Sequence, residues 1–137
     1  MNINEIKEML PHREDMLLIE EAHAQDGVAH GTYRVRGDEF FLRGHFPGNP
    51  VVPGVILCEI MAQTCSVLLG ETIKGATPYF TGLNGVKFRN KVVPGDILRA
   101  ACTIKKSRGN FFFAEGKLFA GEKLCASGEF SFVVVRE

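Results

Sequence analysis

One stretch of the sequence decides the fold, and it reads VILCEIMAQTCSVLLGETI over residues 55–73. It is apolar around nearly its whole circumference, which is typical of a helix that is buried on most sides. Pro53 stands just before it, where a proline suits the first turn because its missing N–H leaves no hydrogen bond unmade. The stretch therefore predicts one long central helix over residues 55–73.

The few polar side chains of this helix fall on one face. Glu59, Gln63 and Ser66 are spaced i, i+4 and i+7, so they form a stripe that Gly70 extends. A carboxylate is seldom buried without a partner, and burial disfavours its charged form, which suits a general acid. The pattern leaves open that Glu59 instead reaches solvent or pairs with a nearby arginine.

The rest of the chain is rich in strand signals. Ile3, Ile6 and Leu10 predict a short N-terminal helix, and the glycines and prolines of residues 44–54 predict an ordered loop. The predicted strands are residues 16–24, 28–36, 79–84, 85–93, 97–107, 111–119 and 124–135. Because strands without intervening helices pair antiparallel, we expect an α+β fold of one domain over residues 1–137, with one central helix packed on a long antiparallel sheet.

Composition excludes several classes of protein. The chain has 137 residues, is 45% hydrophobic and 23% charged, and has a formal net charge of zero, unlike disordered, fibrous or strongly nucleic-acid-binding proteins. No apolar run approaches the roughly 18 residues that suggest a membrane span. The first residues lack the basic start and apolar stretch of a signal peptide, so we expect a cytoplasmic protein.

The charge is unevenly distributed along the chain. Residues 1–50 carry a net charge of −4, whereas residues 87–108 carry a net charge of +6. A basic stretch of this kind is either a solvated face of the sheet or a docking patch for an acidic partner.

Cysteine spacing gives no sign of a metal site. The sequence has no C-x-x-C pair and no histidine at zinc-finger spacing. We expect Cys58, Cys65, Cys102 and Cys125 to be reduced core residues, and we predict no metal and no cofactor.

Two further residues are candidates for chemistry beside Glu59. His45 lies between glycine and proline residues just before the helix, and histidine as a residue type titrates near neutrality, although a lone histidine is more often packed in a structural role. Gly54 begins the helix, where free N–H groups and the absence of a Cβ suit a donor to a carbonyl oxygen, or merely a turn after Pro53. His12, His23 and His30 have no comparable context, and we interpret them as structural or surface residues.

Together these residues suit one reaction. A base, an acid in an apolar setting and a backbone donor are what the removal of water from a 3-hydroxyacyl compound requires. The residues permit this reaction but do not select it.

A longer motif selects it. The segment before the helix reads GHFPGNPVVPGV over residues 44–55 and continues to Glu59 and Gln63. With Leu10-Pro11-His12-Arg13 and the sheet segments of residues 79–96, it resembles the 3-hydroxyacyl-[acyl-carrier-protein] dehydratases of the FabZ type over nearly the whole chain.

The resemblance implies a hotdog fold, a curved antiparallel sheet wrapped around the central helix. It implies dimers, often assembled into hexamers, in which each site takes His45 as base from one subunit and Glu59 as acid from the other. It implies that Gly54 binds the thioester carbonyl and that Gln63 holds the acid or a water. It also implies no cofactor and an acyl tunnel with Tyr79, Phe46 and Val55 at its gate and walls.

The resemblance also gives the basic stretch a partner. Acyl carrier protein is acidic, and we expect it to dock on a set of five basic residues. These are Lys87, Arg89, Lys105, Lys106 and Arg108.

Bifunctional dehydratase-isomerase relatives carry aspartate where this chain has Glu59, so plain dehydration is favoured over isomerisation.

Two alternatives stay open. A hotdog thioesterase generally lacks the segment around His45, and a non-catalytic acyl-binding scaffold would not need His45, Glu59 and Gly54 together.

Overall fold

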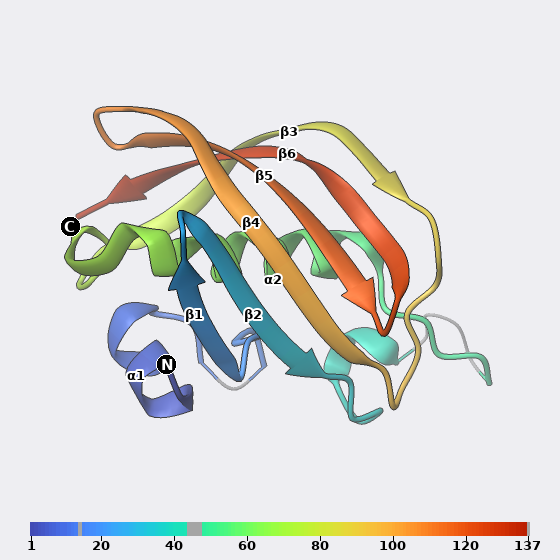
Figure 1. The fold of residues 1–137 in the computed structure, drawn as a ribbon. Coiled ribbons are helices and arrows are strands. Elements are labelled where there is room, and N and C mark those ends of the chain that lie inside the picture. Colours follow the sequence, from blue (N-terminus) through green and yellow to red (C-terminus); the bar gives the residue numbers. More distant parts are fainter. Residues whose placement is uncertain (14, 44–47, 137) are drawn as a thin grey trace.

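The computed structural model describes residues 1–13, 15–43 and 48–136. In these residues a six-stranded antiparallel sheet has the order β1-β2-β4-β5-β6-β3. The strands are β1 Glu21–Gln25, β2 Val28–Arg34, β3 Thr77–Phe88, β4 Ile97–Arg108, β5 Phe111–Ala120 and β6 Lys123–Val135. The sheet curves around helix α2, Gly54–Cys65, which lies behind β2 and β4 in Figure 1. This arrangement is a hotdog fold, so the predicted α+β architecture is confirmed.

Helix α2 is the centre of the core. It contacts β2, β4, β5 and β6, and most of its apolar side chains are buried against them. Each large apolar side chain buried in this way contributes about 1.5–3 kcal/mol. The four cysteines are free and buried, as predicted, and burial raises the pKa of Cys65 to about 12.

The predicted helix over residues 55–73 is wrong in its last third. After Cys65 the chain continues as a 3-10 helix, Ser66–Thr72, with a kink at Gly70, whose φ of 53° lies in the left-handed region. Only glycine adopts that conformation without strain, so the residue that was expected to extend the polar stripe instead kinks the 3-10 segment. The Ser66 hydroxyl donates to the carbonyl of Ala62 at 3.2 Å, a bond that competes with regular helix at the same place.

The N-terminal half of the predicted first strand is also not a strand. Helix α1, Ile3–Met9, forms as expected and begins with a capping box between Asn2 and Glu5. Residues 16–19 then follow as irregular chain, and β1 begins only at Glu21. Leu17, Leu18 and Ile19 are buried there, and the Leu18 N–H donates to the Gln63 side chain of α2 and not to a neighbouring strand.

The two predicted strands over residues 79–93 are one edge strand, β3. Breaks in the pairing register fall between Phe80 and Gly82 and between Asn84 and Lys87, and Gly85 takes a φ of 60°. At these irregularities the strand bends without ending, and it stops at Phe88 and not at residue 93 as predicted.

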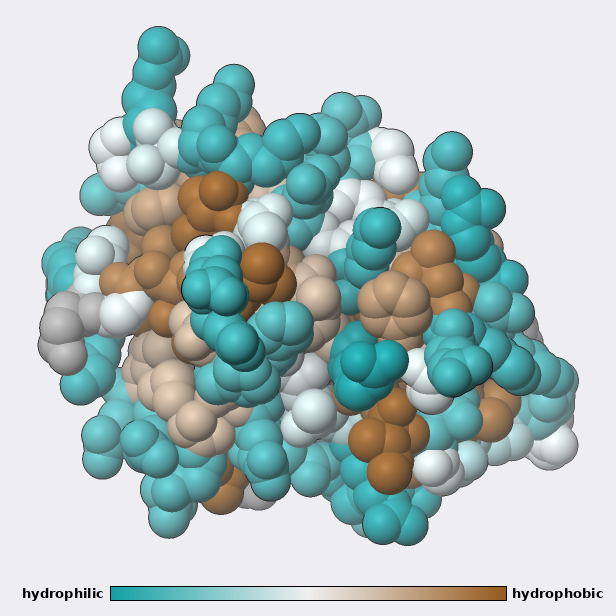
Figure 2. Space-filling model, viewed as in Figure 1, coloured by the Kyte–Doolittle hydropathy of each residue, from teal (hydrophilic) through white to brown (hydrophobic). Residues whose placement is uncertain are grey.

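The exposed face of the sheet carries both hydrophilic and hydrophobic side chains (Figure 2). Along β5 exposed and buried residues alternate, with Phe112, Ala114 and Leu118 turned toward the core. In Figure 2 hydrophobic residues form separate patches among hydrophilic ones on the side that faces the viewer. None of the helices in the described part of the chain is both long and apolar enough to span a membrane.

Candidate active site

A cavity of about 180 Å³ lies where α2, the first half of β3 and the loop after α1 meet. It is lined by His12, Glu59, Ala62, Gln63, Ser66, Pro78, Tyr79, Phe80 and Phe132. The structure therefore brings together three of the predicted site residues, Glu59, Gln63 and Tyr79. A larger hollow of about 560 Å³ on the outer face of the sheet is lined by none of the predicted site residues.

Glu59 is partly buried and has a partner that the sequence did not indicate. Its side chain is 19% exposed, and its Oε1 lies 3.3 Å from Nε2 of His12, whose side chain is 17% exposed. The interpretation of His12 as a structural or surface residue is therefore incomplete, because the histidine faces the predicted acid. The sequence did contain one signal of a role for His12, because this residue belongs to the Leu10–Arg13 segment that is part of the family resemblance.

The backbone around His12 is fixed by its neighbour Arg13. The Arg13 guanidinium donates from Nη1 to the carbonyl of Leu10 at 2.9 Å and from Nη2 to the carbonyl of Lys7 at 3.1 Å. These bonds satisfy carbonyl groups at the C-terminal end of α1, which otherwise have no intrahelical donor. The loop that carries His12 is thereby held to α1.

Gln63 holds the same loop from the other side. Its Oε1 accepts from the Leu18 N–H at 2.8 Å, and its Nε2 donates to the Met16 carbonyl at 2.7 Å. The side chain is buried and both ends of its amide are occupied by backbone groups. In this structure Gln63 therefore positions the loop opposite Glu59, which is one helical turn away.

Gly54 and Val55 line a separate groove of about 520 Å³ at the N-terminal end of α2. The N-cap residue Pro53 makes no side-chain cap, and its carbonyl accepts from the Ile56 N–H at 3.0 Å, so the Gly54 N–H at the start of the helix keeps its donor capacity. A Cβ on Gly54 would lie 2.7 Å from Cζ of Phe88, so glycine permits the close approach of that ring. Val55 is 70% exposed beside it, and Phe88 is 54% exposed.

His45 and Phe46 lie outside the described residues, so the predicted base and tunnel residue have no place in the described geometry. The chain that leads to them is described up to Arg43 and runs from β2 through a 3-10 helix, Phe40–Leu42.

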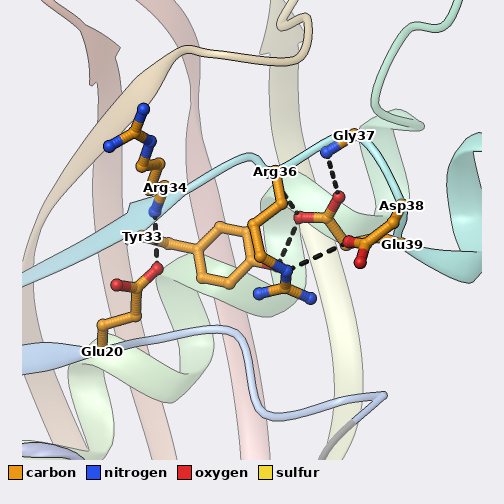
Figure 3. Close-up of polar contacts among 7 residues, drawn as sticks. All are labelled: Glu20, Tyr33, Arg34, Arg36, Gly37, Asp38 and Glu39. Carbon is orange, nitrogen blue, oxygen red and sulfur yellow. Dashed lines mark hydrogen bonds and ion pairs between the residues drawn. The ribbon is translucent and has the colours of Figure 1, made fainter.

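A buried carboxylate fixes the start of that connection. Glu39 is 6% exposed and accepts from the Tyr33 hydroxyl at 2.7 Å, the Arg36 N–H at 3.0 Å and the Gly37 N–H at 2.8 Å (Figure 3). Since Arg36 and Gly37 bind Glu39, the strand β2 ends at Arg34 and not at residue 36 as predicted. Sequence reasoning missed Glu39, although an acid followed by apolar residues Phe40–Leu42 was a signal of burial.

This cluster shifts two pKa values. Burial raises the pKa of Glu39, but hydrogen bonds from Tyr33 and from the Arg36 and Gly37 N–H groups outweigh it and leave the pKa below its usual value. Burial, followed by the hydrogen bond to Glu39, raises the pKa of Tyr33 well above its usual value. The folded state therefore favours an ionised Glu39 that accepts from a neutral Tyr33.

The five basic residues of the predicted docking set do not lie together. Arg89 lines the groove at Gly54, and Lys87 lies near the same end of β3. The other three basic residues are on β4, which is separated from β3 by the two strands β5 and β6. Lys105 is held by Glu129 at 3.1 Å and by Glu115 at 3.9 Å. The remaining two lie toward the far end of β4, where Lys106 stands over the Phe113 ring and Arg108 ends the strand.

Comparison with known proteins identifies the family. Residues 10–129 match the FabA-like domain. The chain is 42% identical to the 3-hydroxyacyl-[acyl-carrier-protein] dehydratase FabZ of Clostridium perfringens, covering 98% of this chain and 99% of that protein. It is 40% identical to FabZ of Pelotomaculum thermopropionicum, with 98% and 99% covered.

Solved structures agree on the fold. The dehydratase heterocomplex ApeI:P from Xenorhabdus doucetiae has a TM-score of 0.83 at 21% identity, over 96% of this chain and 91% of that one. A mutant of the fluoroacetyl-CoA-specific thioesterase FlK has a TM-score of 0.68 at 14% identity, over 85% and 91%. The fold is thus common to dehydratases and thioesterases, and the sequence relatives decide between them: the chain belongs to the FabA-like family and, within it, to the 3-hydroxyacyl-[acyl-carrier-protein] dehydratases of the FabZ type.

Proposed function

We propose that this protein dehydrates (3R)-3-hydroxyacyl-[acyl-carrier-protein] to trans-2-enoyl-[acyl-carrier-protein] in type II fatty acid biosynthesis, as one hotdog domain in the cytoplasm. The observation that carries the proposal is the partly buried Glu59 carboxyl, which lines a half-open cavity beside the helix that follows the GHFPGNPVVPGV motif. The relatives of the same family, at 37–42% identity, bear the name of this activity.

In the proposed reaction His45 takes a proton from C2 of the acyl chain, and Glu59 gives a proton to the C3 hydroxyl. The C3–O bond breaks, water leaves and the C2–C3 double bond forms, so one proton has passed to His45 and one has left Glu59. Negative charge develops on the thioester oxygen, and the Gly54 N–H binds it; the absence of a side-chain cap at the start of α2 supports this role.

We propose that the working unit is a homodimer, assembled as a hexamer, with His45 and Glu59 of each site on different subunits. What supports this is β3, a 12-residue strand at the edge of the sheet. Phe80, Leu83 and Phe88 on it are 42%, 51% and 54% exposed, and an unpaired edge with exposed apolar side chains suits pairing with a second copy.

The remaining proposed site residues form the acyl tunnel and the docking surface for the carrier protein. Tyr79 lines the Glu59 cavity and is 49% exposed, which suits a gate to the acyl tunnel. Val55, which lines the groove at Gly54, and Phe46, which lies outside the described residues, are assigned to the tunnel from the family resemblance alone. The carrier protein docks on Lys87, Arg89, Lys105, Lys106 and Arg108, and Arg89 is supported best because it lines the groove at Gly54.

The test is incubation of the purified full chain with a crotonyl thioester of N-acetylcysteamine. We expect the enoyl absorbance to fall without release of free thiol, because hydration reverses the proposed reaction. Glu59→Gln should abolish this activity, and Glu21→Gln, at an exposed glutamate of β1, is the matched control. Release of thiol would identify a thioesterase, and no reaction with this or a carrier-linked substrate would identify a binding subunit; either result refutes the proposal.

A further inference from the structure

We propose that His12 is a positioning residue that holds the Glu59 carboxyl for proton delivery. The proposal rests on the proposed function of Glu59 as the acid. Its basis is the 3.3 Å approach of His12 Nε2 to Glu59 Oε1 inside the cavity that both residues line.

The surroundings of the ring indicate which nitrogen carries the hydrogen. Nδ1 of His12 is buried and has no hydrogen-bond partner in the described part of the chain. A positively charged ring would place an unpaired N–H at this buried position, whereas a neutral ring with hydrogen on Nε2 leaves only a lone pair there. His12 is therefore a neutral donor, and Glu59 Oε1 accepts from its Nε2–H.

This contact gives the two carboxyl oxygens of Glu59 different roles. Oε1 is occupied by His12, so Oε2 is the oxygen that carries the proton to the departing hydroxyl. When the proton leaves, Glu59 becomes a carboxylate and the bond from His12 becomes charge-assisted, which strengthens it. An interaction that is stronger in the transition state than in the substrate complex raises kcat more than it changes KM.

The fold does not need His12 for its own stability. Arg13 holds one end of the loop to α1, and Gln63 holds residues 16–18 to α2, so the loop is anchored on both sides of the histidine. The unpaired Nδ1 is itself unfavourable. A buried polar atom that weakens the fold beside a predicted acid is explained by function and not by packing.

The experiment compares three variants of the full chain in the crotonyl thioester assay. His12→Leu fills the space without a donor, His12→Gln keeps an N–H within reach of Glu59, and His23→Ala removes an exposed histidine of β1 as the matched control. We expect kcat of His12→Leu to fall about 10- to 100-fold, the effect of losing one hydrogen bond to a charged group. KM and Tm should remain near the wild-type values, and His12→Gln should retain most of the activity.

Three results would overturn the proposal. His12→Leu could retain kcat, or His12→Gln could lose as much kcat as His12→Leu, which would show that the N–H donor does not matter. A fall in Tm of more than about 5 °C with His12→Leu, or failure to fold, would make the residue structural. Failure of the proposed function is a separate outcome, because the wild-type protein and the His23→Ala control would then also fail to hydrate the thioester.

Discussion

Replacement of Glu39 by glutamine should destabilise the protein strongly although the shape of the side chain is unchanged. Glu39 is 6% exposed, and the Tyr33 hydroxyl and two backbone N–H groups donate to it. Glutamine turns one acceptor oxygen into an NH₂ donor, which leaves at least one buried donor unpaired at about 1–3 kcal/mol. The remaining bonds lose their charged acceptor, and each weakens by about 1 kcal/mol. We therefore expect a loss of about 3 kcal/mol in the free energy of unfolding.

The assay is urea unfolding at one protein concentration, since the stability of an oligomer depends on concentration. At neutral pH the urea midpoint of Glu39→Gln should fall by about 1–2 M. The matched control is Asp38→Asn, whose side chain is 80% exposed and pairs with Arg36 at 3.1 Å. An exposed ion pair contributes only about 0–1 kcal/mol, so this variant should unfold nearly as the wild type does.

Acid should reduce the difference between Glu39→Gln and the wild type. The pKa of Glu39 is lower in the folded state than its ordinary value of 4.5, so unfolded chains bind more protons as the pH falls below that value. The stability that Glu39 contributes is therefore present above this pH and lost as the pH falls through the folded-state pKa. A loss under about 1 kcal/mol at neutral pH, or a difference that does not shrink in acid, would refute the reasoning.

Three further predictions concern the site. His45→Ala and Glu59→Gln should each abolish hydration of the crotonyl thioester while Tm stays near the wild-type value; near-full activity in either variant would remove that residue from the mechanism. Gln63→Leu should lower the free energy of unfolding by about 2–4 kcal/mol, because it leaves two backbone groups near Leu18 unpaired, and an unchanged urea midpoint would contradict this. Lys106→Glu should raise KM for carrier-linked substrate more than for the short thioester, and equal effects would argue against docking there.

The centre of the fold could be predicted because its signal is local. The apolar residues from Ile56 to Cys65 specify a buried helix by themselves, and the alternation along residues 111–118 specifies a strand with one buried face. The end of the helix was less predictable. The apolar run continues to Leu69, so hydrophobicity favours helix until Gly70, and only the structure shows that regular α-helix has already stopped.

The contacts that build the site could not be predicted in the same way because they are long-range. Gln63 meets Leu18 across 45 residues, and His12 is 47 positions before Glu59, so no periodicity relates them. Polar side chains on an otherwise buried helix require hydrogen-bond partners, so a polar partner for Glu59 could be expected from the sequence, although not its identity. A histidine in an irregular segment has no pattern that identifies it as that contact, and the partner is this histidine and not the arginine that the pattern left open.

The position of Gly54 and Glu59 on one helix bears on why a site would be shared between subunits. The two residues are five positions apart, which corresponds to about 7.5 Å along the helix axis. In the single chain they nevertheless open onto different hollows, the groove at the start of α2 and the cavity beside His12. Val55 and Phe88, which line the groove at the start of α2, are 70% and 54% exposed. Catalysis requires the thioester and the leaving hydroxyl to be held together and away from water, so in the proposed dimer a second copy would supply the covering surface together with its His45.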